Sequence, residues 1–258
     1  MKEVRIEYPF LFVFRKTTIL HVPEEWIDLS GPQFAVCARV FTENISDEEF
    51  IAGFFGIKKS LAKRVDKFHQ YKLIETVEFI SNPKATINFF FLPEIPGTGL
   101  LAPEKKLKDI TFEHFSIFDS LFFDYVNDKK EESLAKFIAA LYLKKKEKIT
   151  GIDFTARVRF IAEKVDKSTQ YAIFLNYTFI RKWLSKIFPH LFGFVEDDPD
   201  EPKRKTIRPK KPNRPDWITV LDGLVGEDII NYERYKQLPC IVVFRTINKR
   251  IKNYNHGK

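Results

Sequence analysis

Length, composition and charge set the broad class of this chain. It has 258 residues, 44% of them hydrophobic and 15% aromatic, which predicts a globular protein with a sizeable core and argues against general disorder. Its net charge of +8 permits an acidic partner or nucleic acid but does not choose between them. Cys37 and Cys240 lie apart among apolar residues, so we expect two buried thiols in a reducing compartment, not a disulfide framework or a zinc site.

The N-terminal stretch predicts two strands, at residues 4–14 and 17–22, because both are rich in β-branched and aromatic residues. A turn is expected between them, and Pro9 requires an edge strand or a bulge. Acidic residues precede the apolar part and no small-residue cleavage site follows, so we predict no signal peptide. No stretch reaches the roughly 18 apolar residues that span a bilayer, and we expect the protein to be made and kept inside a cell.

Helices are predicted next. Ser30 precedes a helix over residues 32–41, and Ser46 with Glu49 forms a capping box before a short helix that ends near Gly56. Two further helices are expected at 58–65 and 70–80, with a break at Phe68 and His69. The apolar run at 87–93 predicts a strand that joins the N-terminal pair, followed by a loop over 94–107.

The second half of the chain is predicted to be helical. Helices are expected at 112–126 after the cap Thr111, at 131–143 and at 154–164 after the cap Asp153. Residues 166–188, capped by Asp166 or Ser168, are apolar around most of the helix, so we predict a central helix covered by other elements. Its first apolar face holds Ala172, Leu175, Phe179, Trp183 and Ile187, its second holds Ile173, Ile180 and Leu184, and only a narrow polar strip remains at Asn176 and Arg181.

Composition changes sharply after this helix. Residues 196–201 carry five acids in six positions, residues 203–211 carry six bases in nine, and five prolines lie between 199 and 215. This pattern predicts an extended, charged, proline-rich linker over 195–215. We therefore expect a main body at 1–194 and a small C-terminal helical segment at 216–258, with helices at 217–225 after the cap Asp216 and at 240–251. The predicted fold class is mainly α with a small β element (α+β).

No residue pattern indicates a catalytic, cofactor-binding or metal site. The five histidines are not spaced as metal ligands, and we expect His114 and His190 at helix ends or on the surface. Residues 52–60, AGFFGIKKS, lack the glycine that precedes the Lys-Ser pair of a phosphate loop. We expect burial to keep Cys240 unreactive, and the acidic cluster at 196–201 to be a solvated linker. An enzyme of unknown type rests on chain length alone.

The basic run is the segment with the clearest potential to bind a partner. Three interpretations stay open: a tether, a docking site for an acidic protein, or an unspecific contact with DNA or other nucleic acid. Its six cations are Lys203, Arg204, Lys205, Arg208, Lys210 and Lys211. The other predicted contact is the first strand, by strand addition to a neighbour, with partner-binding residues Phe10, Phe12 and Phe14.

Several stretches resemble a known group of proteins. They are HVPEEWIDLSGPQF, LAPEKKLKDITFEHFSIFDSLFFDYV, LAKFIAALYLKKK, the region from Ile152 to Phe192, and DWITVLDGLVGEDIINYERYKQLP. In that order the chain resembles proteins of the structural gene modules of tailed phages that infect Bacteroidetes, crAss-like phages among them. The resemblance covers most of the chain from residue 20 onward, while the opening strand and the charged linker depart from the pattern. It carries over no catalytic residue.

This resemblance implies a non-enzymatic virion or tail-assembly component, made in the host cytoplasm. The leading hypothesis is a head–tail connector or tail ring protein with no cofactor and no membrane span. Its expected partners are other virion proteins and further copies of itself in a homo-oligomeric ring. The alternatives are a tail-assembly chaperone that is not retained in the particle and a nucleic-acid-binding protein that uses the basic linker.

Overall fold

The computed structural model describes residues 2–10, 14–82, 85–193 and 215–256. Helices account for 65% of the structure, and the remainder includes a small two-stranded antiparallel sheet, so the predicted α+β class is confirmed. The chain divides into two compact units: unit 1 is Met1–Ile87 with Asp166–Phe179, and unit 2 is Asn88–Val165 with Ile180–Lys258. This division differs from the predicted body, linker and appendage, because residues 216–258 belong to unit 2.

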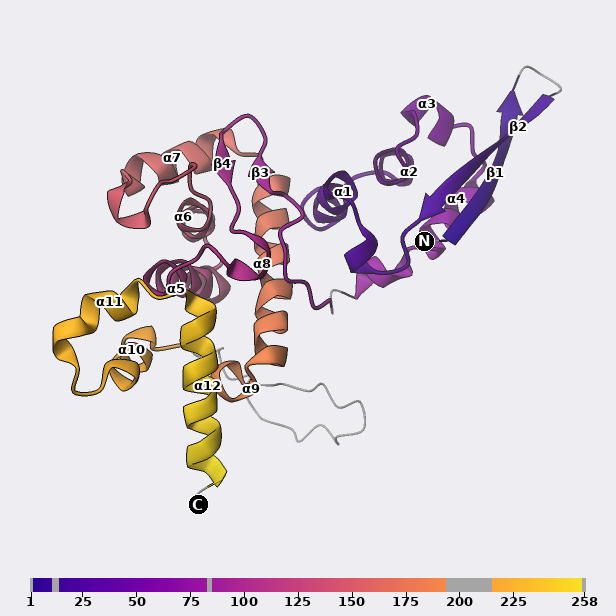
Figure 1. Cartoon of the computed structure of the whole chain (residues 1–258). Helices are drawn as coiled ribbons and strands as arrows, with labels where there is room; N and C mark the ends of the chain where they lie inside the picture. Colours follow the sequence, from indigo (N-terminus) through magenta and orange to yellow (C-terminus); the bar gives the residue numbers. More distant parts are fainter. Residues whose placement is uncertain (1, 11–13, 83–84, 194–214, 257–258) are drawn as a thin grey trace. The chain divides into compact units, whose positions relative to one another are not determined.

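Unit 1 begins with a hairpin of β1 (Lys2–Phe10) and β2 (Phe14–Val22), in which Lys2 lies opposite Val22 (Figure 1). The predicted turn position is wrong, because Arg15 is a β2 residue that lies opposite Pro9. Among the described residues β1 pairs with β2 alone, so Pro9 lies on an edge strand as predicted.

Four helices and two 3-10 turns complete the first part of unit 1. In chain order they are η1 (Trp26–Asp28), α1 (Gly31–Thr42), α2 (Asp47–Phe55), α3 (Lys59–Ala62), α4 (Lys67–Glu75) and η2 (Glu78–Ser81). The predicted capping box of Ser46 is present, and Ser30 forms one as well, with Gln33. The predicted break at Phe68 and His69 is wrong, because Asp66 caps α4 there and accepts a hydrogen bond from the His69 N–H at 3.0 Å.

The core of unit 1 is built on aromatic rings. The Trp26 ring lies edge-on to Phe34 and Phe179, with centroid distances of 6.0 and 5.0 Å. The Trp26 indole N–H donates to the Asn82 carbonyl at 3.2 Å, which satisfies its polar atom on burial. Phe179 comes from α8 (Lys167–Ile187), which Asp166 caps through the Thr169 N–H at 2.8 Å. The first part of this predicted central helix therefore fills the core of unit 1.

The predicted strand at 87–93 is wrong. These residues form no ladder, and the short strands β3 (Glu94–Ile95) and β4 (Leu100–Leu101) pair only with each other as a sheet. Phe90 and Phe91 are nevertheless buried, and the Tyr142 hydroxyl donates to the Leu92 carbonyl at 2.7 Å. The apolarity of this run therefore reflects burial by helices of unit 2, which an apolar run alone cannot distinguish from a buried strand.

Unit 2 is a set of helices around an aromatic core (Figure 1). Its helices are α5 (Phe112–Asp128), α6 (Glu131–Leu141), α7 (Phe154–Lys164), the last part of α8, α9 (Pro189–Phe192), α10 (Trp217–Val225), α11 (Tyr232–Lys236) and α12 (Cys240–His256). Its 3-10 turns are η3 (Lys105–Leu107), η4 (Ile149–Gly151) and η5 (Ile229–Asn231). The predicted caps Thr111, Asp153 and Asp216 are confirmed.

Residues 216–256 pack into this core. The Phe115 ring of α5 lies 4.6 Å from the Phe244 ring of α12 and 5.2 Å from the Trp217 ring of α10, centroid to centroid. Phe115 and Phe244 are completely buried. The C-terminal helices are therefore part of unit 2 rather than an appendage, and α12 runs five residues beyond the predicted end at 251.

The narrow polar strip of α8 is largely buried. Asn176 is 1% exposed, and the Arg181 side chain, 14% exposed, forms an ion pair with the fully buried Asp119 of α5. The Arg181 guanidinium lies 4.4 Å from the Phe123 ring centroid, and the second Asp119 oxygen accepts a hydrogen bond from the Trp217 indole N–H at 2.9 Å. The burial of Arg181 and Asp119 is compensated because α8, α5 and α10 supply charged and hydrogen-bonding partners to one another, which a helical wheel does not reveal.

The apolar face of α8 is covered only in part. Ala172, Leu175 and Phe179 are buried, whereas Ile187 near the C-terminal end is 39% exposed. Among the described residues, no helix is both long and apolar enough to cross a membrane, in agreement with the sequence prediction. Both cysteines are buried as predicted, and burial raises the pKa of each thiol to about 12.

The buried ion pair yields a first prediction. Arg181→Ala leaves the Asp119 carboxylate buried without its cation, so we expect a loss of about 3–5 kcal/mol in the free energy of unfolding. Lys136→Ala, which removes a cation from an exposed pair with Glu132, is the control, with an expected loss below about 1 kcal/mol. Urea denaturation followed by tryptophan fluorescence measures both, and equal effects would contradict the assignment.

Candidate functional site

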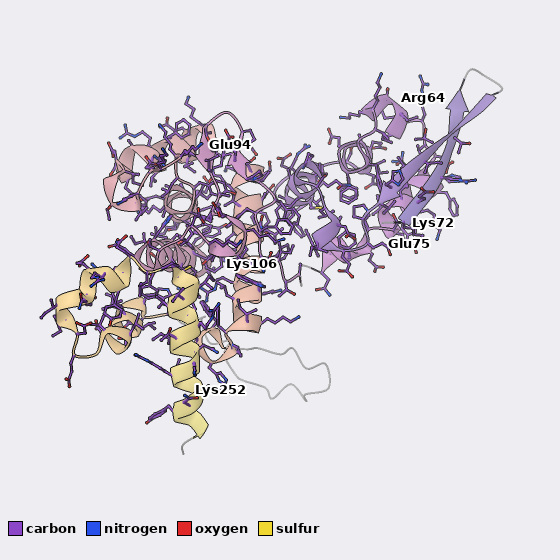
Figure 2. The ribbon with its side chains drawn as sticks, viewed as in Figure 1. Arg64, Lys72, Glu75, Glu94, Lys106 and Lys252 are labelled. Carbon is purple, nitrogen blue, oxygen red and sulfur yellow. The ribbon has the colours of Figure 1, made fainter. Side chains whose placement is uncertain are left out.

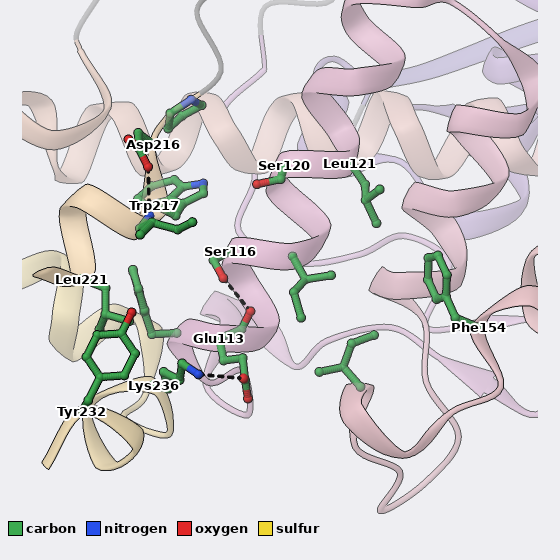
Figure 3. Close-up of a pocket in the computed structure, with 15 residues that line it drawn as sticks. Glu113, Ser116, Ser120, Leu121, Phe154, Asp216, Trp217, Leu221, Tyr232 and Lys236 are labelled. Atoms are coloured by element: carbon green, nitrogen blue, oxygen red, sulfur yellow. Dashed lines mark hydrogen bonds and ion pairs between the residues drawn. The ribbon is translucent and has the colours of Figure 1, made fainter. Parts of the chain in front are cut away.

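Unit 2 carries a groove with a volume of about 820 Å³. Figure 3 shows it between α5, α10 and α11, with Leu121 and Phe154 at one end and Leu221 with Tyr232 at the other. We call it the α5–α10 groove. Phe112 and Trp217, the first residues of α5 and α10, both contribute to its wall.

Most of the groove lining is apolar. The helix α5 contributes Ile117 and Leu121, α10 contributes Trp217, Ile218 and Leu221, and η4 and α7 contribute Ile149 and Phe154. The α5 residues that line the groove recur at intervals of three or four, so they form a continuous strip on one face of the helix. Such a surface binds apolar groups through the hydrophobic effect and offers few polar anchors.

The charged groups of the groove bond to one another. The Glu113 carboxylate accepts a hydrogen bond from the Gln237 side-chain amide at 2.8 Å and lies 3.8 Å from the Lys236 ammonium (Figure 3). The Lys236 ammonium also lies 2.8 Å from Glu233, and this hydrogen bond raises the pKa of Lys236. These pairs join α5 to α11 and keep the lysine charged.

The remaining polar groups support the local backbone. The Ser116 hydroxyl donates to the Glu113 carbonyl at 2.8 Å, one turn earlier in α5. Asp216 accepts hydrogen bonds from the Ile218 and Thr219 N–H groups as the cap of α10. No histidine or cysteine lies among the described lining residues. The arrangement therefore combines a largely apolar lining with the charged pair of Glu113 and Lys236.

Apolar side chains of α10 and of η5, the turn between α10 and α11, are unusually exposed. Ile230 is 98% exposed, Ile229 is 74% exposed and Ile218, which lines the groove, is 69% exposed. We call these three residues the isoleucine surface. Single exposed apolar residues are normal, but several on the elements that border an apolar groove are typical of contact sites. Sequence reasoning missed them, although the acidic residues Glu227 and Asp228 directly before the pair were a signal that this turn faces solvent.

The partner residues predicted from the sequence are not brought together with this groove. Phe10 and Phe14 lie opposite each other at the end of the hairpin in unit 1, and Phe12 lies outside the described residues. The six predicted cations, Lys203, Arg204, Lys205, Arg208, Lys210 and Lys211, also lie outside the described residues.

A second basic surface escaped the sequence reasoning. Arg245, Lys249 and Lys252 recur at intervals of four and three on α12, so they share one helical face, and all three are exposed. Figure 2 shows Lys252 on the last part of this helix. The helix contains no Asp or Glu in its 17 residues. The basic residues between Arg245 and Lys252 were visible in the sequence, but the linker at 203–211 has a higher density of basic residues and was therefore selected as the basic segment.

The other residues that the sequence suggested as candidate site residues have structural roles. His114 lies in the first turn of α5, a helix end as predicted, but it is buried there: it is 8% exposed and its Nε2 lies 2.7 Å from the Ala140 carbonyl oxygen. His190 is exposed, as predicted. In the phosphate-loop-like stretch, Gly56 ends α2 with a left-handed φ of 65° and Lys59 pairs with Glu49 at 2.6 Å. Among the described residues, no group of three or more His, Cys, Asp or Glu is placed to hold a metal ion.

Comparison with known proteins adds no relative: no protein-family model, no curated protein sequence and no solved structure matches this chain.

The buried histidine yields a second prediction. Burial lowers the pKa of His114, so below the unfolded value of about 6.5 the unfolded chain takes up a proton that the folded chain excludes. The free energy of unfolding should therefore fall as pH drops from 7 to 5, with a contribution of at most about 1.4 kcal/mol per pH unit from this side chain. His114→Gln should flatten that slope in urea denaturation at each pH.

The control for this prediction is His190→Gln, which replaces an exposed histidine of the same unit. If both variants flatten the pH dependence equally, or neither does, burial of His114 is not the cause.

Proposed function

We propose that this chain is a non-enzymatic structural component of a tailed-phage virion, a head–tail connector or tail ring protein that acts through protein–protein contacts. The observation that carries the proposal is the isoleucine surface beside the α5–α10 groove, where Ile229 and Ile230 are 74% and 98% exposed. Exposing such side chains to water costs free energy that a covering partner would recover, at roughly 25 cal/mol per Å² of apolar area. The sequence resemblance supports the phage setting.

The chemistry of the groove supports contact rather than catalysis. Its carboxylate and ammonium groups, Glu113 and Lys236, pair with neighbours, and the serine hydroxyl of Ser116 bonds to its own helix. The hairpin supports a further contact, because β1 and β2 are both edge strands among the described residues and a neighbouring strand can add to an edge.

The alternative within this class is a tail-assembly chaperone that does not stay in the particle. Mass spectrometry of purified particles separates the two: peptides of this chain at a stoichiometry typical of a ring support the connector, and their absence supports the chaperone.

The isoleucine surface yields a third prediction. Replacing Ile229 and Ile230 together with Asp should leave the circular dichroism spectrum unchanged but weaken self-association or incorporation into particles by at least about tenfold, because charge is placed in an apolar contact. The measurement is sedimentation velocity of the purified chain, with particle composition by mass spectrometry. The control replaces Ile27 and Phe68, which are 55% and 66% exposed in unit 1, with Asp. Equal loss in both variants would argue against a specific surface.

A second candidate function, binding of nucleic acid, rests on the basic face of α12. Arg245, Lys249 and Lys252 lie in line on one face, as phosphate-binding cations do, and no acidic residue of the same helix opposes them. Nothing in this arrangement reads bases, so the binding would be unspecific.

This candidate yields a fourth prediction. If α12 binds DNA, replacing Arg245, Lys249 and Lys252 with Ala should weaken binding and reduce the slope of log K against log salt by about 3, at roughly 0.9 per phosphate contact. Fluorescence anisotropy with random-sequence duplex between 50 and 200 mM salt measures it. A control replaces Lys63, Arg64 and Lys145, which are exposed outside α12. Absence of binding by the unmodified chain at about 50 mM salt would remove this candidate.

A further inference from the structure

Unit 1 carries a groove of its own, with a volume of about 690 Å³. Its walls are the end of α1, the start of α2, the end of α4 and the turn η2. All of these elements belong to unit 1, so the groove does not depend on the rest of the chain. We call it the acidic groove.

The acidic groove concentrates negative charge in a chain whose net charge is +8. Four carboxylates line it, from Glu43, Asp47, Glu75 and Glu78, and its lining residues, all within the described part of the chain, include no Lys, Arg or His. Arg39 pairs with Glu43 at 3.0 Å. Lys72 pairs with Glu75 at 2.7 Å, and Figure 2 labels both of these residues. Asp47 and Glu78 are exposed and form no ion pair with a described residue, so their charge is available to a ligand.

Between these carboxylates the surface is apolar and aromatic. Tyr71 is 64% exposed, Phe41 and Val40 are each 43% exposed, and the buried side chains of Phe50 and Ile80 form the floor. Exposed aromatic rings along a groove are the feature by which proteins bind proline-rich segments in the polyproline II conformation. An acidic rim adds a requirement for positive charge, and it excludes nucleic acid through repulsion of phosphate.

One segment of this chain has the matching chemistry. Residues 208–214, RPKKPNR, place Pro209 and Pro212 three apart and place Arg208, Lys211 and Arg214 three apart. Polyproline II has three residues per turn, so in that conformation the prolines share one edge and these three cations share another. The segment lies outside the described residues, and the next proline, Pro215, already lines the α5–α10 groove.

We propose that the acidic groove binds residues 208–214 of a second copy of this chain, with the prolines against Phe41 and Tyr71 and the cations toward Asp47 and Glu78. The inference rests on the proposed function, because a ring of identical copies needs a head-to-tail contact between two different surfaces. It assigns those surfaces: the acidic groove on one copy and the basic, proline-rich segment on the next.

The first test uses a fluorescent peptide of residues 203–214 and the full-length chain. The receptor carries Arg208→Ser, Lys211→Ser and Arg214→Ser, so that its own segment does not compete. We expect binding that weakens as salt rises from 50 to 300 mM. A peptide of the same composition, with its prolines no longer three apart, should bind at least about fivefold more weakly.

Groove variants of this receptor locate the site. Asp47→Asn with Glu78→Gln should weaken peptide binding about five- to tenfold, since each charge contact contributes little by itself, and Tyr71→Ala should weaken it independently of salt. The control, Glu163→Gln with Glu227→Gln, removes two exposed carboxylates elsewhere and should change affinity less than twofold. Equal affinity for both peptides, or equal loss in groove and control variants, would overturn the inference.

The second test decides between a second copy and the same chain. One full-length variant carries the Asp47→Asn and Glu78→Gln groove changes with an intact segment, and the other carries the three segment changes with an intact groove. Each variant alone has one half of the contact weakened, so each should associate with itself at least about fivefold more weakly than the two associate with each other, and the mixture should form a heterodimer in sedimentation velocity. A mixture that stays unassociated while the peptide binds would overturn the second copy as occupant.

These outcomes are separable from the proposed function. Failure of peptide binding, with the chain still found in purified particles, removes only this contact. Peptide binding and heterodimer formation, with the chain absent from particles, would keep the contact and remove the virion role.

Discussion

The ion pair between Arg181 and Asp119 is the interaction on which unit 2 depends. Each charge costs several kcal/mol to bury, and this cost is offset only when the remaining hydrogen-bonding positions are filled. Both oxygens of Asp119 are used, one by Arg181 and one by the Trp217 indole, and the guanidinium lies on the Phe123 ring. Because Trp217 is the first residue of α10, this pair fixes the start of α10 against α5. The buried ion pair therefore helps to position Trp217, which forms part of the wall of the α5–α10 groove.

Local structure was largely predictable from the sequence. The caps Ser46, Thr111 and Asp216 were each identified correctly, because a cap satisfies backbone N–H groups two or three residues away and needs no distant partner. The α+β class followed from the same helical periodicities. The error at Phe68 arose from a missed cap, Asp66, rather than from a tertiary effect, and a closer sequence interpretation would have corrected it.

Features that depend on distant partners were not predictable. Arg181 is polar in a largely apolar helix, yet the ion pair with Asp119 of α5 makes its burial favourable. The run at 87–93 is apolar because it is buried by helices of unit 2, not because it pairs in a sheet. His114 can be buried because the Ala140 carbonyl of α6 bonds to its ring. Exposure is equally hidden: Ile230 is as apolar as any core residue, and only the packed structure shows that it faces water.

The two grooves differ in charge, and this difference has a consequence for the assembly that we propose. The α5–α10 groove is apolar with internally paired charges, whereas the acidic groove leaves Asp47 and Glu78 without an ion pair among the described residues. A chain that uses one self-complementary patch forms a closed dimer, but a chain with two different complementary features extends head to tail. Such an extension ends only when the rotation between copies closes a ring. In the assembly that we propose, charge would therefore set the direction in which copies join, and the apolar surface would supply the contact area that fixes the angle between them.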